Sequence, residues 1–412
     1  MLEISVETAR KLLLWKQGFR QRQVPEKRHV LEIIRNLGCV QIDTINVVER
    51  SHYMTLWSRL GPYEKRWLDE LLYPDRKIFE YWAHAASLIP IEQYRYFVHT
   101  MKHIRQGLKA RAEKRLKEKA WLLDRVLEEI RRNGPMSTSD FELDEKPAEK
   151  RSGWWSWSTT KMALEMLYNA GILMVSYRKN FQRYYDLTEN VLSSVLDLTE
   201  PGEDERIRFF ITKTFHALGV AKPSDVSSYY YQWSTSTPLK GKTFDTVLKN
   251  LVSEEVIREV TVEGLKGPYY VPTEDVEIIQ KIGDGNLDCF DEVTFLSPFD
   301  NLTWSKTRTK EFFNFASKLE AYLPQNQRKY GYYNMNILYK NQLVGRIDPK
   351  MHRNRKLLEI NLLHTEKNFK PDTEFKEKLA DAFRRFKAFH NAEKITFRKI
   401  VPKTLGIKKY FD

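Results

Sequence analysis

The spacing of apolar positions changes along the chain, and it divides the sequence into a mainly helical part and a mainly β part. Up to about residue 118, apolar side chains recur at helical spacing, as in Val6–Trp15 and Pro25–Leu37, where Pro25 suits a first helical turn. From 284 to 367 the pattern changes to short β runs such as VTFL and LLEINLL, separated by turns. A charged amphipathic helix is predicted from about Thr373 to His390. The pattern therefore predicts an α+β protein.

The middle of the chain contains a repeat with a period of 85 residues. The repeated pairs are Ser139-Asp140 with Ser224-Asp225, Tyr184-Tyr185 with Tyr269-Tyr270, and Thr188-Glu189 with Thr273-Glu274. Each copy predicts three helices followed by a β hairpin, which is the order of elements in a winged helix. We therefore expect tandem winged-helix domains, an order that also suits a packing or protein-interaction module.

These patterns predict four parts in the chain. Residues 1–118 form an N-terminal helical or winged-helix domain, and residues 119–200 and 201–283 form a second and a third winged helix. Residues 284–412 form an antiparallel β-barrel-like domain with a C-terminal helix. A length of 412 residues is enough for several domains, each with a core of its own.

The charge balance points to a polyanionic partner. The chain has 68 lysines and arginines against 55 acidic residues, a net charge of +13, which favours nucleic acid or an anionic membrane surface. Glu3 and Glu7 stand where a signal peptide would be basic, and no apolar run is long enough to span a membrane. The only cysteines, Cys39 and Cys289, lack CxxC spacing. We expect a soluble, cytoplasmic, nucleoid-associated monomer without disulfides.

The segment Val40-Gln41-Ile42-Asp43 is the candidate for chemistry. In an extended stretch alternate side chains share a face, so Gln41 and Asp43 should point together while Val40 and Ile42 pack inward. On its own this is the pattern of an ordinary amphipathic edge strand. The following segments gather polar and aromatic side chains near this one acid, which suits the binding of a base and a sugar-phosphate backbone. The supporting residues are Asn46, Arg50, His52, Tyr53, Trp82 and His84.

Other familiar sites are missing from the sequence. There is no phosphate-binding glycine loop, no GxSxG nucleophile elbow and no HExxH helix. The nine histidines are scattered, so a metal site is not expected.

Several ordered stretches resemble the AlkZ/YcaQ-type bacterial DNA glycosylases over nearly the whole chain. The matching stretches are 40–63, 80–90, 153–173, 183–189, 296–304 and 330–353. The resemblance implies tandem winged helices and a β-barrel arranged in a C shape around duplex DNA. It also implies removal of guanines alkylated at the position-seven nitrogen and unhooking of interstrand crosslinks joined through that atom, with no cofactor or metal.

The family's catalytic motif is Gln, an apolar residue and then Gln or Asp, and it falls here on Gln41, Ile42 and Asp43. The Asp version resembles the YcaQ branch. A guanine alkylated at that nitrogen is cationic and a good leaving group, so no general acid is required. A carboxylate stabilises the oxocarbenium-like sugar and takes a proton from the attacking water. The resemblance therefore implies that Asp43 is the base and that Gln41 orients the water.

Basic residues in two regions are candidates for phosphate contacts, although such residues commonly form solvated surfaces. They are Lys161, Arg178 and Arg183 in the first repeat copy, and Arg346, Lys350, Arg353 and Arg355 around a hairpin of the β part.

Two other classes of function compete with a glycosylase. A non-catalytic winged-helix DNA-binding or regulatory protein would use the same tandem domains, but it has no need of a paired Gln41 and Asp43 in an aromatic, basic setting. A nuclease is disfavoured because no acidic metal-binding cluster accompanies the basic surface.

The positive charge predicts non-specific binding to duplex DNA that weakens steeply with salt. Each lysine or arginine placed at a phosphate releases counterions, so log K should fall with log salt by about 0.9 per contact. A titration of an unmodified duplex at several salt concentrations measures this slope. An affinity independent of salt would contradict the electrostatic argument.

Overall fold

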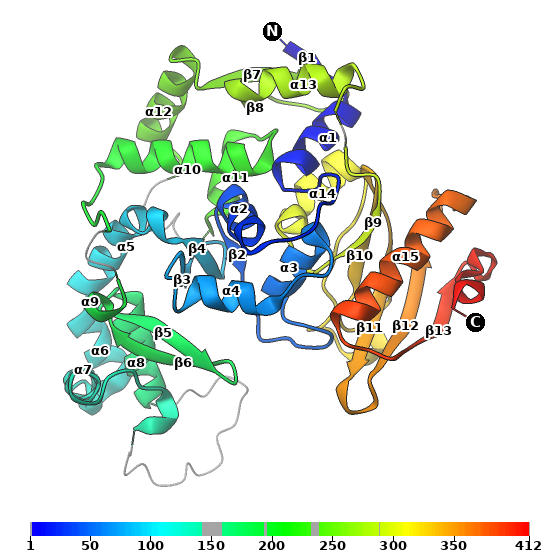
Figure 1. Cartoon of the computed structure of the whole chain (residues 1–412). Coiled ribbons are helices and arrows are strands. Elements are labelled where there is room, and N and C mark those ends of the chain that lie inside the picture. The colour runs from blue at the N-terminus through cyan, green and yellow to red at the C-terminus, as the bar shows by residue number, and fades with distance from the viewer. Residues whose placement is uncertain (1, 142–158, 193–195, 232–238, 288, 412) are drawn as a thin grey trace.

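The computed structural model describes residues 2–141, 159–192, 196–231, 239–287 and 289–411, and it has a mixed α+β fold (Figure 1). Small sheets accompany the helices of the N-terminal and middle parts, and the C-terminal part holds the one five-stranded sheet seen in these ranges. Residues 153–158, which begin one of the family-like stretches, lie outside the described residues.

The first module, residues 27–90, holds the candidate motif. Its elements are α2 (Lys27–Leu37), β2 (Val40–Gln41), α3 (Ser51–Leu60), α4 (Lys65–Leu72), β3 (Ile78–Trp82) and β4 (Ala86–Pro90). β2 pairs antiparallel with β4, which also pairs with β3. Because Glu26 is the N-cap, α2 begins after Pro25, which therefore lies outside the first helical turn where it was predicted.

The two repeat copies have the same order of elements. The second module, residues 122–187, consists of α7 (Leu122–Asn133), the 3-10 turn η3 (Thr138–Asp140), α8 (Thr159–Asn169), β5 (Leu173–Lys179) and β6 (Gln182–Leu187). The third module, residues 203–272, consists of α10 (Glu203–Leu218), α11 (Pro223–Tyr229), α12 (Lys242–Ser253), β7 (Ile257–Val262) and β8 (Tyr269–Pro272).

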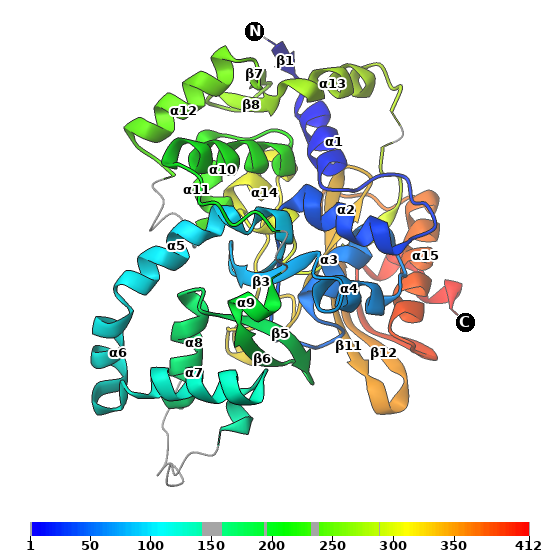
Figure 2. The ribbon, with the colours of Figure 1, turned by 60° about the vertical axis from the view of Figure 1, so that its left-hand side comes forward.

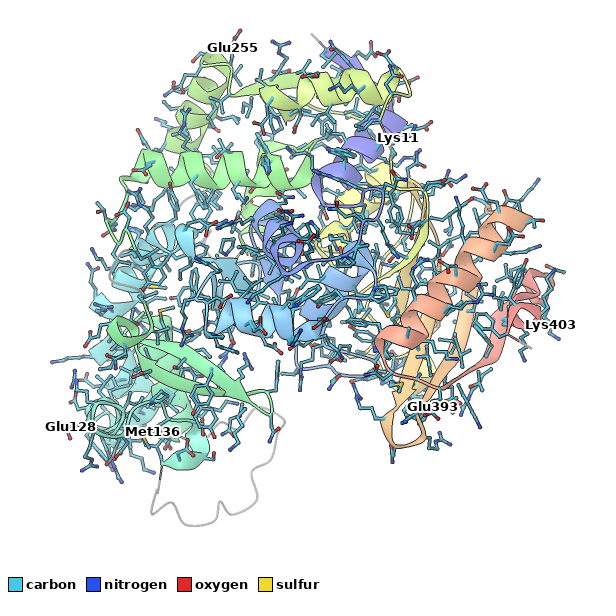
Figure 3. The ribbon with its side chains drawn as sticks, viewed as in Figure 1. Lys11, Glu128, Met136, Glu255, Glu393 and Lys403 are labelled. Atoms are coloured by element: carbon cyan, nitrogen blue, oxygen red, sulfur yellow. The ribbon has the colours of Figure 1, made fainter. Side chains whose placement is uncertain are left out.

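One backbone feature recurs with the period of the repeat. Met136 forms an isolated antiparallel bridge with Tyr185, and Ala221 forms the same bridge with Tyr270, 85 residues later at both positions. Met136 lies in the lower-left lobe (Figure 3). The predicted hairpins are present in both copies, as β5–β6 and β7–β8.

Further elements lie before, between and after the modules. They are β1 (Leu2–Ile4), α1 (Val6–Lys16), α5 (Arg95–Gln106), α6 (Leu108–Leu116), α9 (Thr188–Val191) and α13 (Val276–Gly283). β1 pairs in parallel with β7, and α1 packs against α13, so the start of the chain lies against the third module (Figure 2).

The C-terminal part is an open mixed sheet. Its elements are β9 (Val293–Leu296), α14 (Lys306–Phe313), β10 (Met335–Tyr339), β11 (Gln342–His352), β12 (Leu357–Thr365), α15 (Thr373–Phe389) and β13 (Lys394–Val401). The strand order is β13-β12-β11-β10-β9, with β13 parallel to β12.

The prediction of an antiparallel β-barrel is therefore wrong for the described residues. β9 and β13 are the two edges of the sheet, and they do not pair with each other. The connection between β12 and β13 runs through α15, and a helical crossover brings the chain back in the same direction, which makes the last pair parallel. The apolar face of α15 covers the sheet.

Two of the hydrophobic cores explain how the parts are joined. The first module shares a core with the C-terminal sheet, in which Val40 and Ile42 lie in one cluster with Ile347 and Met351. The second and third modules share another core. Across the first of these boundaries, Arg59 donates to Asp300 at 2.7 and 3.0 Å, and both side chains are fully buried. Of the helices described, none combines the length and apolar character needed to cross a membrane.

Candidate active site

The motif begins where α2 stops. Gly38 ends the helix with φ +75°, and a side chain there would lie 2.7 Å from the Tyr230 hydroxyl, so glycine fits this turn. Val40 then pairs with Leu88, and the amide of Ile42 donates to the carbonyl of Ala86 at 2.8 Å.

Alternation along this strand is as predicted. Val40 and Ile42 are buried, whereas Gln41 and Asp43 are each partly exposed. The carbonyl of Gln41 accepts a hydrogen bond from the Ser51 hydroxyl at 2.8 Å, which ties the strand to the start of α3. Among the described residues, no hydrogen bond engages the side-chain amide of Gln41.

Asp43 lies in a local turn in which one of its carboxylate oxygens accepts a backbone hydrogen bond. Its Oδ1 accepts from the amide of Ile45 at 2.8 Å. Burial raises the pKa of Asp43, and the Ile45 amide and the Arg50 charge only partly oppose this. A carboxylate with a raised pKa is a stronger base, which suits proton transfer from water.

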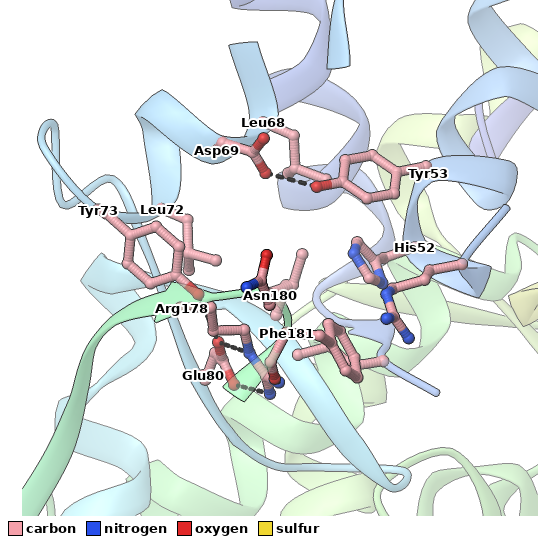
Figure 4. A pocket seen from close by; sticks show the side chains of 13 residues that line it. His52, Tyr53, Leu68, Asp69, Leu72, Tyr73, Glu80, Arg178, Asn180 and Phe181 are labelled. Atoms are coloured by element: carbon pink, nitrogen blue, oxygen red, sulfur yellow. Dashed lines mark hydrogen bonds and ion pairs between the residues drawn. The ribbon is translucent and has the colours of Figure 1, made fainter. Parts of the chain in front are cut away.

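Two cavities meet beside this strand. The first has a volume of about 440 Å³, and its lining includes Asp43, Trp82, Lys161 and Tyr185. The second has a volume of about 410 Å³, and its lining includes His52, Tyr53, Tyr73 and Glu80 (Figure 4). Ile42, Arg178 and Phe181 line both cavities, so they form the wall between them.

Phe181 belongs to the tip of the β5–β6 hairpin of the second module. Asn180 and Phe181 have φ angles of +51° and +69°, a conformation that is strained for a bulky side chain and needs support from its surroundings. The Arg50 guanidinium lies 3.4 Å from the centroid of the Phe181 ring, and that of Arg178 lies 4.3 Å away. Because Arg50 also donates to the carbonyl of Thr44 at 3.1 Å, the hairpin tip contacts the loop that follows Asp43 through Arg50.

A buried ion pair fixes this hairpin to the first module. Arg178 donates to both carboxylate oxygens of Glu80 at 2.7 and 2.6 Å, and Tyr73 adds a hydrogen bond at 2.8 Å (Figure 4). Burial by itself would raise the pKa of Glu80, but Arg178, Arg183 and Tyr73 lower it to about 2. Glu80 is thus ionised at neutral pH.

The same contacts change the interpretation of two predicted DNA-binding residues. Arg178 and Arg183 are only 13% and 16% exposed, and Arg183 also pairs with Glu165 at 3.0 Å. Their charges are used to join the two modules, and in this arrangement their guanidinium groups point into the protein. Lys161 is exposed and lines the Asp43 cavity, as a phosphate-binding residue would.

The predicted basic hairpin of the C-terminal part also has both buried and exposed basic residues. Arg346 is buried between Phe315 and Tyr330 and pairs with Glu366, so it does not face solvent. Lys350 and Arg355 are exposed and have no ion pair within the described residues.

Arg353 and Met351 link that hairpin to the loop that follows Asp43. Arg353 donates to the side chain of Asn46 at 2.7 Å and to the carbonyl of Val48 at 2.9 Å. The amide of Met351 donates to the carbonyl of Val47 at 3.1 Å. The loop after Asp43 is therefore held from both sides, by the hairpin of the second module and by the hairpin of the C-terminal sheet.

The remaining candidates have structural partners. Burial and the nearby Arg178 lower the pKa of His52 to about 3, so its ring is neutral, and it stacks on Phe181. The hydroxyl of Tyr53 donates to Asp69 at 2.6 Å. The indole of Trp82 donates to Asn169 at 2.6 Å.

His84 lies away from the cavity of Asp43. It stacks on Trp304 at 4.1 Å, and its Nδ1 lies 3.1 Å from the carbonyl of Ser228. The structure therefore brings Arg50 and Trp82 to the site and leaves His84 between the first and third modules.

Comparison with known proteins decides the family. The family model "DNA glycosylase AlkZ-like" matches residues 34–389. The chain belongs to the AlkZ-like DNA glycosylase family. Its fold is similar to that of Streptomyces sahachiroi DNA glycosylase AlkZ, with a TM-score of 0.63, 15% identity, and coverage of 97% of this chain and 100% of that chain. This family membership agrees with the resemblance carried by the motif stretches.

Sequence reasoning missed Glu80 and Phe181 as parts of the site. Glu80 lies inside a family-like stretch, but a lone acid in a β run gave no sign of its arginine partners. Phe181 follows Asn180 in a polar turn, and an apolar ring at the tip of a hairpin was the one available signal.

The Glu80 pair yields a prediction about stability. Glu80→Gln leaves the Arg178 guanidinium buried without its counter-charge, so the free energy of unfolding should fall by about 3–5 kcal/mol. Because the pKa of Glu80 is lowered in the folded state, the stabilisation is complete above its ordinary value of 4.5 and is lost as the pH falls toward about 2.

Urea unfolding of both proteins at neutral and acidic pH measures this difference. The control is Glu277→Gln, which breaks an exposed pair with Lys281 and should change stability far less, because exposed ion pairs contribute little. Equal effects of the two substitutions would contradict the assigned role of Glu80.

Proposed function

We propose that the protein is a monofunctional DNA glycosylase that hydrolyses the N-glycosidic bond of cationic position-seven alkylguanines, including those in interstrand crosslinks. The observation that carries this proposal is the placement of Asp43. It lies at the end of an anchored strand, with a raised pKa, in a cavity that an exposed lysine also lines. Membership of the DNA glycosylase family supports cleavage of an N-glycosidic bond in DNA.

In the proposed reaction, breaking of the bond between the sugar and the cationic guanine runs ahead of the attack by water. The electron pair of that bond goes to the base, which leaves as a neutral alkylguanine. Asp43 stabilises the positive charge that develops on the sugar, and Gln41 orients a water. The carboxylate takes a proton as the water oxygen bonds to the sugar carbon, and an abasic site remains. The proposed chemistry needs no cofactor or metal.

The architecture supports binding of duplex DNA in this proposal. We interpret the three modules as winged helices within the parts 1–118, 119–200 and 201–283, arranged with the C-terminal part 284–412 in a C shape around double-stranded DNA. The protein acts as a monomer in the cytoplasm, associated with the nucleoid. Lys161, Lys350 and Arg355 are its phosphate contacts, since they are exposed and Lys161 lines the catalytic cavity.

The catalytic pair gives the most specific prediction. Asp43→Asn removes the proton acceptor and the negative charge but keeps the side-chain size, so excision should fall by two or more orders of magnitude. Gln41→Ala should lose less, because water still reaches an intact carboxylate. Single-turnover excision of a position-seven alkylguanine by wild type and both variants is the measurement.

Unchanged DNA affinity and melting temperature are the controls for both variants. Wild-type excision by Asp43→Asn would show that the motif is not the active site. If the wild type itself binds DNA but excises nothing, the alternative of a non-catalytic DNA-binding or regulatory protein is correct.

The presence of Lys161 in the cavity makes the monofunctional assignment testable. A lysine that attacked the sugar would form a Schiff base, which borohydride reduces to a stable protein–DNA adduct. We expect no adduct with wild type. Trapping that disappears in Lys161→Arg would contradict direct hydrolysis by water.

The exposed part of the C-terminal hairpin gives a further prediction. The variant with Lys350→Ala and Arg355→Ala should bind duplex DNA more weakly. The slope of log K against log salt should become shallower by the equivalent of about two phosphate contacts. The matched control is Lys403→Ala with Lys408→Ala, two exposed lysines near the chain end. Lys403 lies at the right-hand edge of the C-terminal part, away from the tip of the β11–β12 hairpin (Figure 3). An equal loss in both double variants would contradict a specific role of the hairpin.

A further inference from the structure

Two exposed tyrosines lie in the segment between α14 and β10, outside the catalytic motif and the basic hairpin. The Tyr322 side chain is 74% exposed and that of Tyr332 is 38% exposed. Among the aromatic side chains of the described residues, that of Tyr322 is the most exposed. An aromatic ring held so far out of the core has its face free for a partner.

Packing and a hydrogen bond join this segment to the loop that follows Asp43. The ring of Tyr333 is buried in the hydrophobic cluster that also holds Ile42 and Met351, and the amide of Met351 donates to the carbonyl of Val47 at 3.1 Å. Partial burial and the charge of Asp43 also raise the pKa of Tyr322. The tyrosine segment is therefore joined through the C-terminal sheet to the loop that carries Asp43.

The segment is built to hold its rings in place. Gly331 has φ +108°, and a side chain there would lie 2.2 Å from the Asp348 carboxylate, so the chain passes close to that acid. Asp348 accepts from the amide of Tyr333 at 3.1 Å, and Glu320 accepts from the amide of Tyr330 at 2.7 Å. These bonds fix the backbone on each side of the turn that carries Tyr332.

A cation completes the surface. Arg328 donates to the carbonyl of Leu323 at 2.9 Å, and its guanidinium lies 4.9 Å from the centroid of the Tyr332 ring. Aromatic rings with an adjacent arginine are the combination by which proteins stack nucleobases without regard to sequence. Among the described residues, no other ring and no cation stacks on the ring of Tyr322.

We propose that Tyr322 and Tyr332 form a stacking surface for the nucleobase that loses its neighbour when the damaged nucleotide is displaced toward Asp43. An enzyme that acts on a base in a duplex must disturb its stacking, and this costs free energy that an aromatic surface offsets. The identity of the substrate as DNA rests on the proposed function. The stacking itself is separate from the excision chemistry.

The test uses a duplex with a tetrahydrofuran abasic site beside the fluorescent adenine analogue aminopurine, and a matched intact duplex. Wild type should bind the abasic duplex more tightly than the intact duplex, and it should quench the aminopurine fluorescence. Tyr322→Phe keeps the ring and should behave as wild type. Tyr322→Leu removes the ring and should weaken binding to the abasic duplex by roughly 5- to 100-fold, with unchanged affinity for the intact duplex.

A second exposed aromatic serves as the control. Trp121→Leu removes a ring that is 52% exposed on the second module, and it should change neither binding nor quenching. Wild-type behaviour of Tyr322→Leu would overturn the proposal. An equal loss in Tyr322→Phe would also overturn it, because the hydroxyl and not the ring would then make the contact.

This outcome is distinguishable from a failure of the proposed function. The abasic duplex has no base to excise, so its binding does not depend on the reaction. Excision of an alkylguanine by wild type tests the reaction alone. If the protein stacks on the abasic duplex but excises nothing, this inference stands and the glycosylase proposal is refuted.

Discussion

The buried pair of Glu80 and Arg178 is the interaction on which the site depends. It holds the β5–β6 hairpin of the second module against β3 of the first, with bonds of 2.7 and 2.6 Å between side chains that are almost inaccessible to solvent. This contact brings Phe181 to the loop that follows Asp43, where Arg50 lies over its ring. Removing one partner of a buried pair leaves an uncompensated charge, so the junction between the modules and the geometry of the site are coupled.

Three distant segments meet at Asp43. The segment that follows β2 supplies the carboxylate, the second module supplies the wall at Phe181, and the C-terminal hairpin holds the following loop through Met351 and Arg353. A base for water needs a carboxylate that is ionised yet poorly solvated. The partial burial of Asp43, balanced by one backbone amide and the charge of Arg50, provides this combination.

Much of the architecture could be predicted from the sequence, because it follows from local patterns. The hairpins β5–β6 and β7–β8 and the alternation of Val40 to Asp43 are set by the spacing of apolar residues and by turn residues. The open sheet was missed because the parallel pairing of β13 depends on the packing of α15, which no local pattern encodes. The burial of Arg178, Arg183 and Arg346 could not be predicted for the same reason, since only the folded chain brings them to Glu80, Glu165 and Glu366.

The central claim is that Asp43 acts as the base of a hydrolytic excision. The pH dependence of single-turnover excision tests it most directly, with the substrate in the same duplex throughout. The rate should rise with pH through one ionisation above the ordinary aspartate value of 3.8, because burial raises the pKa of Asp43 and only its ionised form accepts a proton. The residual rate of Asp43→Asn should lack this ionisation. A profile that keeps the same ionisation in Asp43→Asn would assign the base to another residue and contradict the account.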